Sequence, residues 1–194
     1  MRKERARSRG DRQGEKKETN KLKSILGWTF EIIVVILFAY ILVFFFGQVR
    51  TNIGQSMDTT LSGGDKVLIN TLAYKLGGPS RNDIISFKPN GSKPSHAYIK
   101  RVIGLPGETI QIKEGMIYIN DKVYLEDADY PSISNAGLAD QPIVLGSSEY
   151  FVLGDNRNNS EDSRYADIGN VNTDDIEGKV WLRVSPASEF GFVK

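Results

Sequence analysis

The chain has 194 residues, of which 40% are hydrophobic and 25% are charged, enough for one modest folded core with appendages. Its net charge of +1 is unevenly distributed along the chain. Residues 1–24 hold ten Lys or Arg and four Asp or Glu, a net charge of +6, which leaves −5 for the remainder. Cysteine is absent, which excludes disulfides and thiol chemistry, and the single histidine, His96, excludes multi-histidine metal sites. We therefore expect no metal and no cofactor.

Residues 1–24 contain almost no apolar side chains. They cannot bury enough surface to fold, so we predict a disordered basic arm. A basic arm can bind nucleic acid. The long apolar run that follows favours a position beside a membrane instead, and we expect no nucleic-acid partner.

Residues 25–47 read ILGWTFEIIVVILFAYILVFFFG, 23 residues against the roughly 20 that cross a bilayer as a helix. Trp28 suits an interface, and Glu31 lies close enough to one end to snorkel. A buried core helix is the first alternative, but the run is apolar on all sides. A cleavable signal peptide is the second, but no A-x-A pattern follows Gly47. We predict a single-pass signal-anchor in the cell membrane, with a cytoplasmic N-terminus and residues 48–194 outside.

Residues 48–194 predict a mainly β domain. The strand-like segments are short, rich in Val, Ile, Tyr and Phe, and separated by Gly, Pro, Asn and Asp. They are DKVLIN, DIISF, AYIKRVIG, TIQIKEGMIYINDKVYL, PIVLG, EYFVLGD and GKVWLRVSP. Asn120-Asp121 predicts a hairpin turn, because both residues tolerate positive φ. Residues 126–140 predict an exposed polar loop whose role the sequence does not indicate.

Ser56, in NIGQSMDTTL just beyond the apolar run, is a candidate nucleophile that needs a base. His96 and Lys100 lie on one strand-like segment, about 13 Å apart, so only one of them can reach the hydroxyl. A lysine base needs its pKa of about 10.4 lowered by burial, for which Ile99 and Val102 are suitable neighbours. A histidine base needs an orienting partner. The residues alone favour Lys100 and leave His96 open.

A dense polar loop follows the strand-like segment EYFVLGD. It holds Asp155, Arg157, Ser160, Asp162 and Arg164. An EF-hand calcium loop beginning at Asp155 is excluded, because arginine, serine and alanine occupy the third, sixth and twelfth positions of that 12-residue loop. A solvated loop is the ordinary reading of this composition. The two arginines and two aspartates could instead form an ion-pair frame around a site.

Three segments, in this order after one N-terminal span, resemble the bacterial type I signal peptidases. They are GQSMDTTLSGGDKVLIN, YIKRVIGLPGETI and GDNRNNSEDSRYADIG. The single anchor and short chain are similar to the Gram-positive branch, and the resemblance extends from the anchor to about Val171. It implies a β-rich catalytic domain in which a Ser/Lys dyad cleaves signal peptides from exported preproteins. It therefore favours Lys100 over His96 as the base.

The resemblance also implies roles for individual residues. Ser56 corresponds to the nucleophile, Lys100 to the general base, and Ser160 to the serine that orients the lysine ammonium. The ion pair that supports the site in the family corresponds to Asp162 and Arg164, and the supporting turn corresponds to Gly154 and Asp155. The residues that line the family's shallow substrate pockets correspond to Met57, Leu61, Tyr98 and Ile99. The implied partners are exported preproteins, the lipid bilayer and the secretion machinery.

Two positions depart from the family pattern. Thr59 replaces the usual proline, so the turn loses a fixed φ. Gly54 stands where some members have a serine that donates a hydrogen bond to the oxyanion. The oxyanion hole must then rely on the Ser56 N–H and a main-chain donor near Gly54. Losing one donor without replacement typically costs about 10²- to 10³-fold in rate.

Alternatives from other classes are a membrane-anchored β-domain that binds without catalysis and a Ser/Lys autoprotease of the repressor type. The intact Ser56 and Lys100 pair argues against the first. A repressor would carry a helix-turn-helix, which this N-terminus lacks. A hydrolase that uses Ser56 with His96 is a third, weaker alternative.

Overall fold

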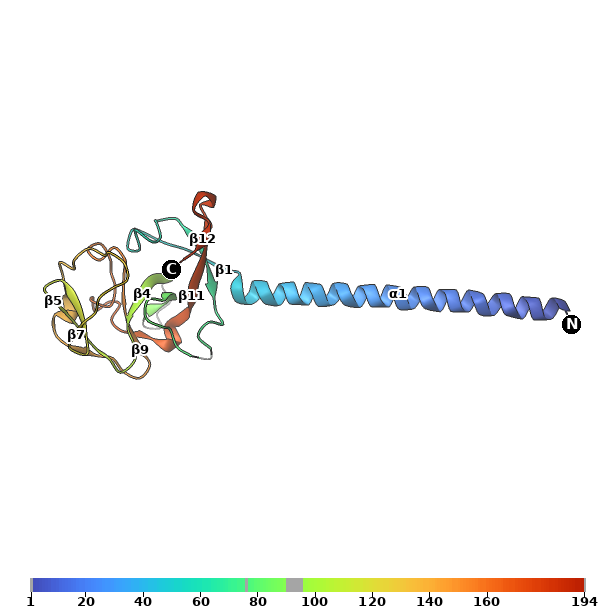
Figure 1. The fold of residues 1–194 in the computed structure, drawn as a ribbon, viewed down its shortest axis with the longest axis horizontal. Coiled ribbons are helices and arrows are strands. Elements are labelled where there is room, and N and C mark those ends of the chain that lie inside the picture. Colours follow the sequence, from blue (N-terminus) through green and yellow to red (C-terminus); the bar gives the residue numbers. More distant parts are fainter. Residues whose placement is uncertain (1, 76, 90–95, 194) are drawn as a thin grey trace. The chain divides into compact units, whose positions relative to one another are not determined.

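The structure, a computed structural model, describes residues 2–75, 77–89 and 96–193. It separates into two units, Met1–Phe44 and Phe45–Lys194. The first unit is helical and the second is β-rich (Figure 1).

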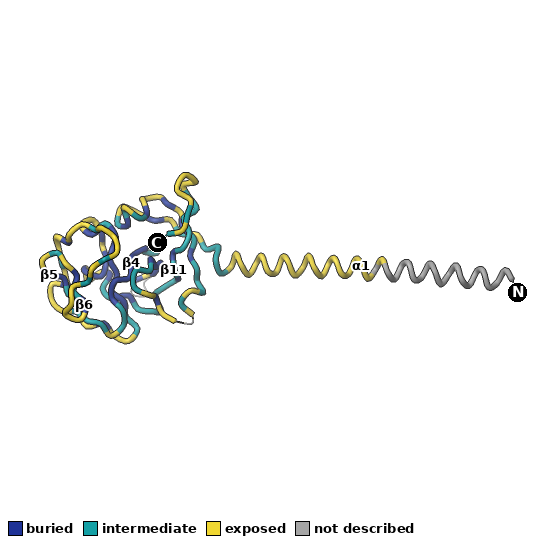
Figure 2. The backbone as a smooth tube through the Cα atoms, viewed as in Figure 1, coloured by how far each residue is buried: buried dark blue, intermediate teal, exposed yellow. Residues whose placement is uncertain are grey.

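Helix α1 (Arg2–Phe46) contains a segment, Lys23–Phe46, that is long and apolar enough to cross a membrane. None of the best apolar window is buried (Figure 2), as expected for a helix that contacts lipid rather than a protein core. This segment agrees closely with the predicted span at residues 25–47.

Helix α1 begins at Arg2 and so includes residues of the arm, whose predicted disorder stays a prediction. Composition and continuity both favour a helix there. Arg, Lys, Glu and Gln dominate the arm and have good helix propensity. The apolar segment that follows is already helical, so the costly nucleation step does not have to be repeated.

The second unit contains two antiparallel sheets. Its strands are β1 (Gln48–Thr51), β2 (Lys66–Asn70), β3 (Ile84–Phe87), β4 (Tyr98–Gly104), β5 (Thr109–Lys113), β6 (Met116–Ile119), β7 (Lys122–Val123), β8 (Ile143–Val144), β9 (Glu149–Leu153), β10 (Val171–Asn172), β11 (Ile176–Ser185) and β12 (Gly191–Phe192). Short 3₁₀ turns are η2 (Gly137–Asp140), η3 (Thr173–Asp175) and η4 (Ala187–Glu189). Among the described residues, the larger sheet has the order β1-β2-β11-β3-β4-β9-β10, with β12 on β11, and the smaller has the order β7-β6-β5-β8.

The predicted mainly β fold is confirmed, and each predicted strand segment overlaps at least one observed strand. The hairpin prediction is also confirmed, because Asn120 and Asp121 both have positive φ and lie between paired β6 and β7. The sequence did not predict β1, β10 or β12, which are two to four residues long.

Strand β4 is central to the larger sheet and carries the predicted base. It pairs with β3 on one side and with β9 on the other. Six of its seven residues are buried, including Lys100. The end of β9 lies opposite Arg101, with Leu153 as its register partner. The sheet therefore brings the lysine strand beside the start of the polar loop at Gly154.

Candidate active site

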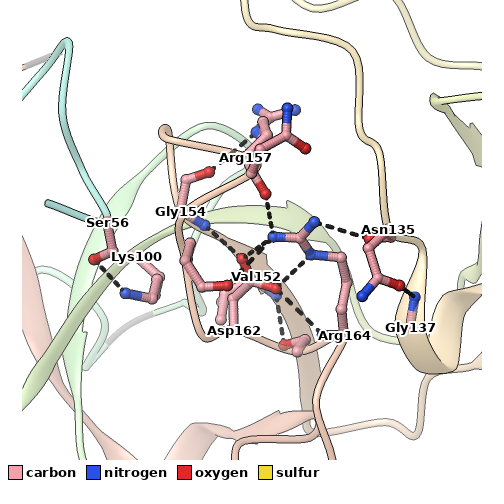
Figure 3. A network of polar contacts seen from close by, with 12 residues as sticks. Ser56, Lys100, Asn135, Gly137, Val152, Gly154, Arg157, Asp162 and Arg164 are labelled. Atoms are coloured by element: carbon pink, nitrogen blue, oxygen red, sulfur yellow. Dashed lines mark hydrogen bonds and ion pairs between the residues drawn. The ribbon is translucent and has the colours of Figure 1, made fainter.

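The predicted nucleophile and base meet. Lys100 Nζ on β4 lies 2.6 Å from Ser56 Oγ, which comes from the turn between β1 and β2 (Figure 3). The Lys100 side chain lies at the buried end of this contact, with only 3% of the residue exposed, whereas Ser56 is half-buried. A hydroxyl and an amine at this distance can exchange a proton directly.

Burial lowers the pKa of Lys100 to about 8, and the loss of solvation of the ammonium is the largest cause. Negative charge on Asp162, and to a smaller extent on Glu161, opposes this shift. The lowered value means that a substantial fraction of the amine is neutral near pH 8. A neutral amine is the form that can accept the serine proton.

The turn between β1 and β2 carries Ser56 and is called the nucleophile turn below. It is fixed by Asn52, which is buried. Its side-chain amide donates to the carbonyl oxygens of Leu61 and Ser62, at 3.0 and 3.1 Å. Its main-chain N–H and C=O bond to Asp65 and Gly64, both at 2.8 Å. Asn52 thus joins the two ends of the turn and so holds the segment that carries Ser56.

The backbone of this turn is left-handed at both family departures. Gly54 has φ of 77° and Thr59 has φ of 88°. Glycine adopts this conformation freely, whereas a β-branched residue there is strained and proline is excluded. The Ser56 N–H donates no hydrogen bond to any described residue, which leaves it available to an oxyanion.

Asp155 anchors the loop after β9 to both other elements of the site. Its carboxylate is fully buried and accepts two hydrogen bonds from Arg101 on β4, at 2.8 and 2.7 Å. Thr60, in the nucleophile turn, donates to the same carboxylate at 2.6 Å. One carboxylate therefore joins the turn, the lysine strand and the loop.

A second buried ion pair shapes the loop itself. Arg164 donates to both carboxylate oxygens of Asp162 at 2.8 Å, and neither side chain is more than 1% exposed. Asp162 also accepts from the main-chain N–H of Gly154 at 3.1 Å. Breaking a buried pair of this kind typically costs about 3–5 kcal/mol, because the remaining charge loses its partner. Of the predicted frame, the pair of Asp162 with Arg164 is therefore present, whereas Asp155 pairs with Arg101 and Arg157 with Glu126.

Gly154 lies where the loop passes closest to the nucleophile. A Cβ at this position would come within 2.4 Å of Ser56 O and 2.2 Å of Ser160 Oγ. Only glycine allows this approach. Asn156 N then donates to Ser56 O at 3.1 Å, so the loop directly bonds the main chain of the nucleophile.

Ser160 lies beside Gly154 and is nine-tenths buried. Its Oγ makes no hydrogen bond to any residue that the structure describes. Its predicted role in orienting the lysine ammonium stays a prediction. Its place in the wall of the cavity that holds Ser56 and Lys100 is compatible with that role.

An open cavity of about 480 Å³ contains the dyad. Tyr98, one of four predicted pocket residues, lines it, together with Ile53 and Tyr165. Tyr98 also lies close to Lys100, whose Nζ is 5.8 Å from the centre of the Tyr98 ring.

The other three predicted pocket residues lie in the core. Met57, Leu61 and Ile99 are at most 4% exposed and pack in one hydrophobic cluster beneath the nucleophile turn. The structure thus places them as support for the turn, and a part in substrate binding stays a prediction. His96, the alternative base, is exposed and lines a different hollow, with Arg50 and Lys88.

Sequence reasoning missed two features of the site. Arg101, the partner of Asp155, follows Lys100 directly, and an arginine inside an apolar strand was the available signal. The second is the loop at residues 126–140. Through Glu126 and Asn135 it contacts the polar loop that follows β9. No local pattern indicated these contacts.

The chain is similar in sequence to known proteins. Residues 25–185 match the family described as signal peptidase, peptidase S26. The chain belongs to this family. A signal peptidase IB of Staphylococcus aureus strain COL is 36% identical over 185 residues, covering 87% of this chain and 93% of that protein. A probable signal peptidase I-2 of Synechocystis is 35% identical over 156 residues, covering 77% and 68%.

Among solved structures, a signal peptidase I from Enterococcus faecalis V583 is similar. It is 31% identical, and the match covers 54% of this chain and 97% of that one with a TM-score of 0.42. As a family member the chain is a hydrolase of the signal peptidase class.

Proposed function

We propose that this family member is a membrane-anchored serine endopeptidase that removes signal peptides from exported preproteins through Ser56 and Lys100. The observation that carries the proposal is the 2.6 Å contact between Lys100 Nζ and Ser56 Oγ inside an open cavity. The lowered pKa of Lys100, about 8, supports its role as the base.

In the proposed reaction, Ser56 Oγ attacks the scissile carbonyl carbon while its proton passes to neutral Lys100. The Ser56 N–H stabilises the oxyanion. The C–N bond then breaks, and the lysine ammonium gives its proton to the leaving amine. Water attacks the resulting ester as Lys100 takes one of its protons. The bond from the carbonyl carbon to Ser56 Oγ then breaks, the lysine ammonium returns the proton to Ser56 Oγ, and the signal peptide leaves with a new carboxylic acid that ionises.

Membrane anchoring belongs to the proposal. The apolar segment Lys23–Phe46 supports it, and the ten basic residues of the arm favour a cytoplasmic N-terminus. The nine residues from Gly47 to Ser56 reach at most about 30 Å. The nucleophile therefore stays near the outer membrane face, where an exported preprotein presents the end of its own apolar segment.

The test is incubation of the detergent-solubilised full chain with an exported preprotein, followed by N-terminal sequencing of the product. Cleavage at the end of the signal peptide is expected for the unmodified chain. Ser56→Ala and Lys100→Ala should abolish it, whereas His96→Ala should leave it unchanged. Full activity of Lys100→Ala would refute the dyad.

A further inference from the structure

The loop at residues 126–140 binds the two buried arginines of the polar loop from outside. Glu126 pairs through both carboxylate oxygens with the two terminal nitrogens of Arg157. Further along, Asn135 O accepts from Arg164 Nη1 at 3.0 Å. Asn158 adds side-chain hydrogen bonds of 2.8 and 3.0 Å to residues 134 and 132. An excursion that the sequence leaves without a role is thus attached to the site at several points.

Arg157 is enclosed, and each of its three guanidinium nitrogens donates a hydrogen bond. Only 1% of its side chain is exposed, and its guanidinium lies 4.2 Å from the centre of the Tyr130 ring. Its third guanidinium nitrogen, Nε, donates to Gly154 O at 3.1 Å. An arginine buried to this degree needs a carboxylate partner, and Glu126 is the ion-pair partner that the described residues provide.

The contacts continue from Arg157 to the nucleophile. Arg157 fixes the carbonyl of Gly154, where an added Cβ would meet Ser56 O and Ser160 Oγ. Two residues later Asn156 N donates to Ser56 O. Figure 3 shows Arg157 directed at Gly154, which lies between it and the Ser56 and Lys100 pair. A displacement of Arg157 would therefore shift the main chain that holds Ser56.

We propose that Glu126, through Arg157, is a positioning residue for the nucleophile, so that the loop at residues 126–140 acts as a brace for catalysis. The proposal rests on the proposed Ser56 and Lys100 chemistry. Glu126 touches neither residue, so its effect must pass through the main chain of residues 154–156. Small displacements of a nucleophile can cost about a hundredfold in rate, because the attack geometry is narrow.

The test compares Glu126→Gln, Glu126→Asp and Asp127→Asn with the unmodified full chain in detergent micelles. Glutamine keeps the shape of Glu126 but removes the charge that Arg157 needs. Aspartate keeps the charge on a shorter side chain. Asp127 is the exposed neighbouring carboxylate and serves as the matched control. The readouts are kcat and KM for a preprotein, the folded fraction, and the pH dependence of kcat/KM.

For Glu126→Gln we expect kcat per folded molecule to fall at least tenfold while KM changes less than threefold. Its pH profile should shift to higher pH, because a loosened loop admits water to Lys100 and restores part of its ordinary pKa. Glu126→Asp should recover part of kcat, and Asp127→Asn should match the unmodified chain.

A purely structural role would lower the folded fraction and scale the pH profile without moving it. That result, or an unchanged kcat in folded Glu126→Gln, would overturn the proposal that Glu126 positions the nucleophile. Failure of the proposed function is distinguishable, because cleavage by the unmodified chain would then be absent or would persist in Ser56→Ala.

Discussion

Replacing Lys100 by methionine should abolish cleavage and, at the same time, stabilise the fold. Methionine has similar length and keeps the apolar contacts of the lysine stem, but it carries no charge. Lys100 is only 3% exposed, so its ammonium has lost nearly all of its water. The substitution therefore removes a charge that the folded chain holds at a cost and removes the proposed base.

The size of the effect follows from the pKa of Lys100, which burial lowers from 10.5 to about 8. Each unit corresponds to about 1.4 kcal/mol, so protonated Lys100 disfavours the folded state by about 3 kcal/mol at pH 7. The unfolded chain binds more protons between pH 8 and 10.5, so this cost is full below pH 8 and falls as pH rises. At pH 9.5 about half of this cost remains, and above pH 10.5 it disappears.

The assay is urea unfolding of the detergent-solubilised chain, followed by tryptophan fluorescence at pH 7.0 and pH 9.5. Lys100→Met should raise the free energy of unfolding by about 3 kcal/mol at pH 7.0 and by about half as much at pH 9.5. Lys122→Met, at an exposed lysine on β7, should change it little at either pH. An unchanged or lower stability of Lys100→Met at pH 7.0 would refute the claim that the fold lowers this pKa.

Three further outcomes are expected. The rate constant kcat/KM should rise about tenfold from pH 7 to pH 9 with a midpoint near 8, because the neutral fraction of Lys100 rises from about 9% to 91%; a flat profile would contradict a lysine base. Gly154→Ala should lower cleavage by at least about a hundredfold, since its Cβ meets Ser56 O at 2.4 Å. The control is a preprotein assay with Gly146→Ala, whose added Cβ meets only side-chain atoms, at 3.3 Å or more. Thr59→Gly should raise the free energy of unfolding by about 1 kcal/mol in urea, because it relieves a φ of 88°; a loss of stability would show that the threonine is unstrained.

The sequence predicted those parts of the fold that depend on local pattern. Strand β4 is apolar around Lys100 and ends in a Gly-Leu-Pro-Gly turn, so both its existence and the burial of the lysine follow from neighbours in the chain. Strands β10 and β12 have two residues each and are stabilised by partners on β9 and β11. No local signal identifies such strands, because the pairing itself is the reason they are extended.

The sequence motifs do not predict the direction in which each side chain points. Resemblance predicts a part in substrate binding for Met57 and Ile99, and this stays a prediction; the structure packs both side chains in the core beneath the turn. A motif fixes residue order, but which face a side chain takes depends on the local backbone and on distant contacts. The partnership of Arg101 with Asp155 spans 54 positions, and that of Glu126 with Arg157 spans 31. Both require the folded sheet to bring the segments together.

The two departures of the nucleophile turn from the family pattern have one physical explanation. Sequence alone treats Gly54 as a lost hydroxyl donor and Thr59 as a lost constraint on φ. In the structure both have positive φ, 77° and 88°. A serine at the first position would carry left-handed strain, and a proline at the second could not adopt this φ. The backbone of this turn therefore favours glycine at residue 54 and excludes proline at residue 59, while Asn52 and Asp155 still hold Ser56 against Lys100.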